Sequence, residues 1–222
     1  MQLTQTIPLI LRANTATDST PLRVREVMPL VIFAGALYGT AMGSFGGIGP
    51  DHWLQMVYSA VKVPLLLGVS FALTVPGFFI LNTLLGLRGD FRLAIRAVTT
   101  AQAGLAITLA SLSPFVALFY ASCGDYEWAI LFNGLMFAIA TFTGQILLRR
   151  FYRQLIDTNP RHRKLLRSWV TVYAFIAMRM AWVLRPFVGG HGEATTFFRP
   201  GAWGNAYIVV WDLVWNSVRG RG

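Results

Sequence analysis

The chain has 222 residues, of which 55% are hydrophobic and only 13% are charged. A soluble domain carries about 25% charged residues, so this composition argues against a soluble enzyme and favours an integral membrane protein. The formal net charge is +10 and the single cysteine is Cys123, which excludes an internal disulfide and a cysteine-based metal cluster. Most cations flank hydrophobic segments without a nucleic-acid recognition motif, so we expect contacts with lipid and not with nucleic acid.

Five hydrophobic segments are long enough to cross a bilayer, which takes about 20 mostly apolar residues per helix. They are Val27–Gly47, Tyr58–Leu85, Ala97–Tyr120, Trp128–Leu148 and Trp169–Val188. The sequence therefore predicts an all-α polytopic membrane helix bundle of five transmembrane helices over residues 27–188, preceded by a polar arm of residues 1–26. Residues 189–222 form an aromatic tail, in which Ile208–Val218 is too short to span and suits an amphipathic helix in the membrane interface.

The connecting segments alternate in charge along the chain. Cations gather in the N-terminal arm, in the connector Arg88–Arg96 and in the connector Arg149–Arg167, whereas the connectors around Asp51 and Asp125 have none. The positive-inside rule then predicts a cytoplasmic N-terminus. Five spans place the C-terminus on the extracytoplasmic side, in a membrane that we expect to be the bacterial inner membrane.

The first segment carries a stripe of glycines. Gly35, Gly39 and Gly43 repeat at every fourth residue, so they lie on one face of a helix. Small-residue stripes let helices approach closely in lipid. The stripe predicts close packing either within the chain or against a partner subunit or a second copy.

Three cations lie in or beside the predicted spans. Lys62 is near the outer end of the second span, where we expect it to snorkel to the interface or to pair with an acidic connector; a ligand-binding role is the alternative. Arg179 lies near the middle of the fifth span, and Arg185 follows it. A charge at that depth is costly, so Arg179 is interpreted as a structural anchor, a partner or lipid contact, or a substrate-binding group.

The most basic connector is expected to lie on the membrane surface. It contains Arg149, Arg150 and Arg153, and the Asn159–Pro160 pair is expected to divide it into two helical pieces. Anionic phospholipid is the ligand that such a segment predicts. At the other end of the chain, we expect the tail residues Trp203, Trp211 and Trp215 to lie at headgroup level and to contact lipid or a partner.

Motifs for catalysis or for cofactor binding are absent from the sequence. There is no phosphate-binding loop, zinc-protease helix or nucleophile elbow, and the three histidines fall on different connectors. His191 and Glu193 alone are a weak metal signal, so no metal and no cofactor is expected. No predicted span contains Asp or Glu, which argues against ion-coupled transport.

Two stretches of sequence resemble known membrane proteins. The tail pattern WVLRPFVGG…FFRPGAWGNAY looks like uncharacterised bacterial multi-pass proteins. The stretch Ser59–Val98, with its basic turn Phe91–Ala97, and the layout of residues 55–190 are similar to the Yip1-like superfamily. The resemblance implies five helices, a cytoplasmic N-terminus and a non-enzymatic protein that works through protein or lipid contacts. The N-terminal motifs of eukaryotic Yip1 proteins are missing, so their trafficking role is not carried over.

Taken together, these features predict a non-catalytic membrane subunit or scaffold. The alternative is a channel or carrier for an anionic or neutral small solute, motivated by Lys62, Arg179 and the prolines and hydroxyl side chains of the spans. A membrane enzyme acting on lipid is a third hypothesis, but it would need acids or histidines gathered on one face.

Overall fold

The computed structural model describes residues 24–47, 53–189 and 196–198. These residues form α2 (Val24–Gly43), η1 (Ser44–Gly46), α3 (Trp53–Leu84), η2 (Arg88–Asp90), α4 (Phe91–Ser122), α5 (Tyr126–Thr158) and α6 (Arg161–Val183). Within them the fold is all-helical, and four helices, α2 to α5, are long and apolar enough to cross a membrane. The apolar helices indicate an integral membrane protein, as the composition predicts.

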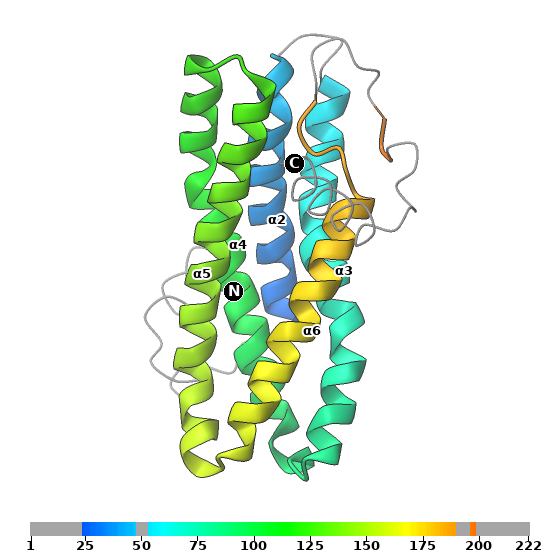
Figure 1. The fold of residues 1–222 in the computed structure, drawn as a ribbon, viewed down its shortest axis with the longest axis vertical. Helices are drawn as coiled ribbons and strands as arrows, with labels where there is room; N and C mark the ends of the chain where they lie inside the picture. Colours follow the sequence, from blue (N-terminus) through cyan, green and yellow to red (C-terminus); the bar gives the residue numbers. More distant parts are fainter. Residues whose placement is uncertain (1–23, 48–52, 190–195, 199–222) are drawn as a thin grey trace, which may run out of the picture.

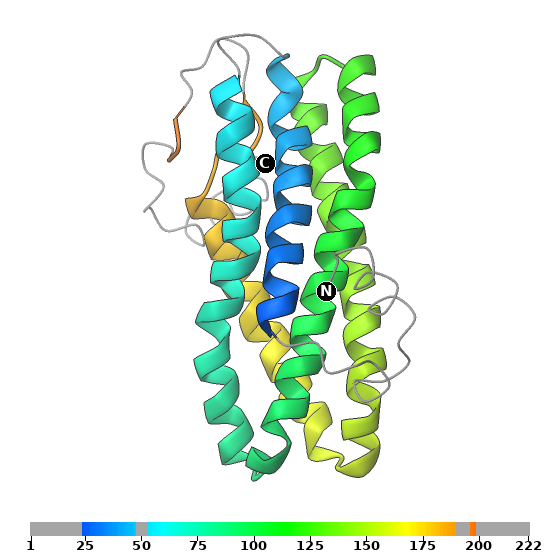
Figure 2. The same cartoon turned by 180° about the vertical axis from the view of Figure 1, so that it is seen from behind.

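The helices run side by side in an elongated bundle (Figures 1 and 2). α2 packs closely on α3 and α4, α5 packs on α4, and α6 packs mainly on α3. The α3–α4 and α5–α6 connections share one end of the bundle, and the α4–α5 connection is at the other. We call the first the basic end, because the arginines of the predicted second and fourth connectors meet there.

Two buried clusters are stacked along the bundle. The cluster farther from the basic end joins α2 to α4 and α5, with Tyr38 and Leu109 fully buried. The cluster near the basic end joins the end of α3, the start of α4 and the end of α5 to the start of α6, and it includes Phe78, Phe151 and Leu165. α2 and α6 therefore each fill the middle of the bundle over part of its length.

The start of α5 follows a local signal. The carboxylate of Asp125 accepts hydrogen bonds from the backbone N–H groups of Glu127 (2.8 Å) and Trp128 (3.3 Å), which satisfies free donors of the first turn. At its other end α5 does not stop at Leu148, where the predicted span ends. It continues through Arg149, Arg150 and Arg153 to Thr158, so the basic stretch prolongs the spanning helix.

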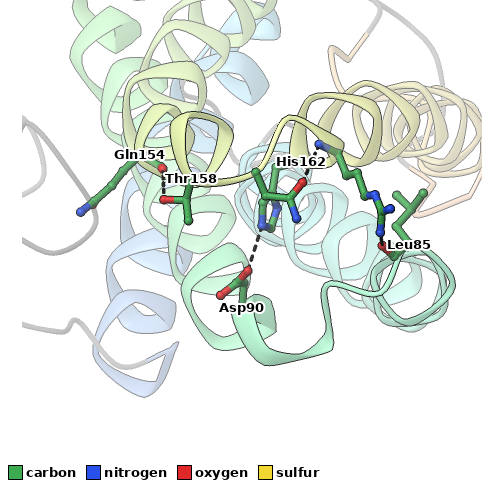
Figure 3. A network of polar contacts seen from close by, with 7 residues as sticks. Leu85, Asp90, Gln154, Thr158 and His162 are labelled. Atoms are coloured by element: carbon green, nitrogen blue, oxygen red, sulfur yellow. Dashed lines mark hydrogen bonds and ion pairs between the residues drawn. The ribbon is translucent and has the colours of Figure 1, made fainter.

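The predicted break at Asn159–Pro160 is confirmed, since α6 begins at Arg161. The side chain of Asn159 accepts a hydrogen bond from the backbone N–H of Arg161 at 3.1 Å. His162, which is fully buried, lies 3.2 Å from the carboxylate of Asp90 in η2. Figure 3 shows that this pair and the Arg161–Leu85 contact tie the two connections of the basic end together.

A fifth membrane-spanning helix over Trp169–Val188 is not confirmed. α6 ends at Val183 and is not among the helices apolar enough to span, and Leu184–Gly189 continue outside any helix. Pro186 explains why the helix does not continue to Val188, since the residue before a proline disfavours helical backbone and proline lacks the N–H that a helix interior needs. The predicted interfacial helix Ile208–Val218 lies outside the described residues, as does most of the arm of residues 1–26; α2 starts at Val24.

Candidate functional site

Lys62 lies in the interior of the bundle, inside α3. Its side chain is fully buried, so the prediction that it snorkels to the membrane interface is wrong. It has no carboxylate partner among the residues that the structure describes. A buried cation is costly unless polar groups surround it, and the structure provides those groups from the chain segment that follows α6.

Three polar side chains of α3 face that segment. Gln55, Ser59 and Lys62 recur every three to four residues and share one helical face. Lys62 Nζ donates to the carbonyl oxygen of Pro186 at 2.5 Å. The hydroxyl of Ser59 (2.5 Å) and the amide of Gln55 (3.1 Å) both donate to the carbonyl oxygen of Phe187.

Two aromatic rings complete the surroundings of Lys62. Its Nζ lies 5.1 Å from the ring centre of Phe197 and 5.9 Å from that of Tyr58, within the range of cation–π attraction. The two rings contact each other edge to face at 5.3 Å. Lys62 therefore holds two separate parts of the chain beyond α6, the carbonyl of Pro186 and the ring of Phe197.

The arrangement explains how non-helical backbone is accommodated against the bundle. Irregular backbone inside a membrane is tolerated only where its polar groups are paired within the protein. The carbonyls of Pro186 and Phe187 accept from α3, and the carbonyl of Val188 accepts from the Tyr126 hydroxyl of α5 at 3.4 Å. We name this arrangement the α3 clamp: Gln55, Ser59 and Lys62 with the carbonyls of Pro186 and Phe187.

A second buried polar network lies across α2, α4 and α5. The Tyr38 hydroxyl donates to Asn133 Oδ1 at 3.0 Å, Asn133 Nδ2 donates to the Tyr120 hydroxyl at 2.5 Å, and Tyr120 donates to the carbonyl of Met42 at 3.3 Å. Such bonds join membrane helices. The partners of Asn133 are 13 and 95 residues away in the chain, so no local sequence pattern indicates this network.

The glycine stripe lies against α3 of the same chain. A Cβ atom at Gly39 would lie 2.7 Å from the carbonyl carbon of Ser59, one at Gly43 would lie 2.7 Å from Met56 Cα, and one at Gly35 would lie 3.2 Å from Pro64. The close packing predicted for Gly35, Gly39 and Gly43 is thus made within the chain. This face is covered by α3 and is not open to a partner.

The other predicted contact residues lie apart from the α3 clamp. Arg179 is half-buried on α6, four residues before the helix ends, and Arg185 follows the helix with its guanidinium 4.3 Å from the ring centre of Trp182. Arg149, Arg150 and Arg153 are exposed near the end of α5. Trp203, Trp211 and Trp215 lie outside the described residues.

An apolar groove runs along the outside of α2 and α3. Its volume is about 850 Å³, and small residues including Ala36, Ala60 and Gly68 contribute to its lining. Ile32 and Val61, which also line it, are about half exposed. The groove therefore offers an apolar surface with room for a close-lying chain or helix.

The described part of the chain contains no group of three or more His, Cys, Asp or Glu side chains able to hold a metal ion. Comparison with known proteins identifies no relative, since no protein-family model, no curated protein and no solved structure matches the chain.

Proposed function

We propose that this protein is a non-catalytic integral membrane subunit or scaffold that acts through protein and lipid contacts in a membrane complex. The observation that carries the proposal is the hydrogen bond from Lys62 to the carbonyl oxygen of Pro186 in the same chain. Lys62 is the one Lys, Arg, Asp or Glu side chain buried among the described residues, and it bonds to the chain's own carbonyl. This bond holds the segment after α6 against α3, which supports a structural role for Lys62.

The membrane arrangement that we propose keeps the sequence-based orientation. The basic end faces the cytoplasm of a bacterial cell, because cations are retained on that side. α6 together with Leu184–Gly189 forms the fifth crossing, and the tail lies in the outer interface as an amphipathic helix. Anionic phospholipid then meets the arginines of α5.

The protein contact of this proposal lies in the α2–α3 groove. Helix association in lipid depends on close packing, and small residues allow it. Gly68 faces open space, since no atom lies within 4 Å of the position its Cβ would take. We propose that a transmembrane helix of a partner subunit occupies this groove. The groove then replaces the glycine stripe, which α3 covers, as the contact surface for a partner.

The test is purification from the native membrane in a mild detergent, followed by size determination and mass spectrometry. We expect one partner at fixed stoichiometry, lost when Gly68→Leu fills the groove. Gly134→Leu is the matched control, because Gly134 also faces open space, but on α5. A lone 24.6 kDa protein, or equal loss in both variants, would refute the proposed contact.

A channel or carrier for an anionic or neutral small solute is the alternative. It would require the solute to contact Lys62 or Arg179. The hydrogen bond from Lys62 to Pro186 leaves fewer N–H groups of the ammonium available to a solute. Solute flux into liposomes that contain the purified protein, abolished by Arg179→Ala, would favour the carrier over the scaffold.

A further inference from the structure

A crevice separates α5 from α6. After the turn at Asn159–Pro160, α6 leans away from α5 toward α3, as Figures 1 and 2 show. The space between them has a volume of about 260 Å³ and is lined by α4, α5 and α6. Its lining includes the small residues Gly144 on α5 and Ala174 and Ala177 on α6.

Two polar side chains of the crevice have no partner. Thr141 and Gln145 of α5 line it, and no residue in the described part of the chain accepts from or donates to their side chains. Tyr173 and Gln102, which also line it, are by contrast bonded to each other at 3.1 Å, and Gln102 donates to the carbonyl of Leu67 at 3.3 Å. An amide that faces hydrocarbon without a hydrogen-bond partner is unfavourable. A ligand that accepts a hydrogen bond from Gln145 would therefore be stabilised in this crevice.

Cations lie on the same helix faces as the crevice lining, about one helical turn nearer the basic end. Thr141, Gln145, Arg149 and Arg153 are spaced four residues apart and therefore follow one face of α5. Arg149 and Arg153 also line a hollow on the surface of α5 at this end. On α6, Arg167 precedes the lining residues Val170 and Ala174 on the same face, and all three arginines are exposed.

We propose that this crevice is a specific site for one anionic glycerophospholipid. Its phosphate is held by Arg149 and Arg167, an ester carbonyl accepts from the amide of Gln145, and an acyl chain lies along Gly144, Ala174 and Ala177. Along α5 the order of cation, amide and small apolar residue matches the order of phosphate, ester and chain in the lipid. Gln145 lies one helical turn, about 6 Å, deeper than Arg149, which suits that ligand.

A free phosphate would use only the arginines and would leave Gln145 and the apolar crevice empty, so the lipid fits more of the site. The inference deepens the lipid contact of the proposed function and requires no partner subunit. Failure to find a partner protein would therefore leave it intact, and loss of the lipid site would leave the partner contact in the α2–α3 groove intact.

The test is native mass spectrometry of the purified full chain, loaded with phosphatidylglycerol or with phosphatidylcholine. We expect one retained phosphatidylglycerol at a concentration at least tenfold below that needed for phosphatidylcholine. The double variant Arg149→Gln/Arg167→Gln should lose this preference, and Gln145→Leu should weaken retention roughly threefold to tenfold, the size of one hydrogen bond.

The matched control is Arg88→Gln/Arg92→Gln, which removes the same charge from exposed positions at the same end of the bundle. Retention should be unchanged in it. Equal retention of the two lipids by the unmodified protein, an equal loss in the control pair, or complete displacement of the lipid by excess inorganic phosphate would each overturn the proposal. The comparison of the two lipids needs no variant, so a misfolded variant would not decide the result.

Discussion

Gly39 shows how much one residue contributes to the packing of this bundle. A side chain at this position would meet backbone atoms of α3, with the Ala60 Cα only 2.9 Å from the added Cβ. Backbone cannot rotate away as a side chain can, so the two helices would have to separate. The spacing of the glycines identified the packed face correctly, but the helix that covers it was not readable from the spacing.

At the residue scale we therefore predict that Gly39→Ala destabilises the protein. Overpacking a tight contact costs about 1–3 kcal/mol, and here the neighbour is backbone. Thermal unfolding in detergent should show a clearly lower midpoint for this variant. Gly134→Ala is the control, because a Cβ there meets no atom within 4 Å and alanine favours the helix; an equal loss in both would contradict the packing argument.

At the scale of elements, α6 and the segment after it behave as one unit. The helix stops at Val183 and the chain continues as Leu184–Gly189, held by the α3 clamp. Hydropathy predicted a single helix to Val188 because it counts apolar side chains and not backbone hydrogen bonds. Lys62, interpreted from sequence as an interfacial residue, is instead the donor that makes this irregular segment possible inside the bundle.

We predict that Lys62→Met releases this segment. A hydrogen bond to a charged group contributes about 1.5–3 kcal/mol, so the segment should open at least tenfold more often. The readout is maleimide labelling of Val188→Cys, a position only 4% exposed, in a Cys123→Ser background. Lys164→Met, which removes an exposed cation of α6, should leave the labelling rate unchanged. If Lys62→Met is labelled as slowly as the protein that retains Lys62, Lys62 does not hold the segment after α6.

For the whole molecule, the bundle brings its positive connectors to one end. Arg88 in η2 and Arg92 at the start of α4 are far in the chain from Arg161 and Arg163 at the start of α6, but all four share the basic end. Cys123, next to Asp125, lies at the opposite end. This polarity is what the alternating connectors predict, and it makes the orientation in the membrane testable with the native cysteine.

We predict that a membrane-impermeant maleimide labels Cys123 in intact cells. The matched variant Gly89→Cys/Cys123→Ser carries its thiol in η2 at the basic end, where Gly89 is exposed. It should be labelled only after the membrane is permeabilised, because cations are retained on the cytoplasmic side. The reverse pattern would invert the proposed topology.

The sequence by itself determined the protein class, four of the five membrane-length helices that it predicted, the break at Asn159–Pro160 and the face on which the glycines lie. Composition, helical period and proline geometry are local properties, so they can be read from the sequence. Only the tertiary structure decided which helix covers the glycines, that Lys62 bonds to the backbone after α6, and that Tyr38, Asn133 and Tyr120 form one network. These features depend on pairs of groups far apart in the chain, and a pattern within one helix carries no information about its neighbour.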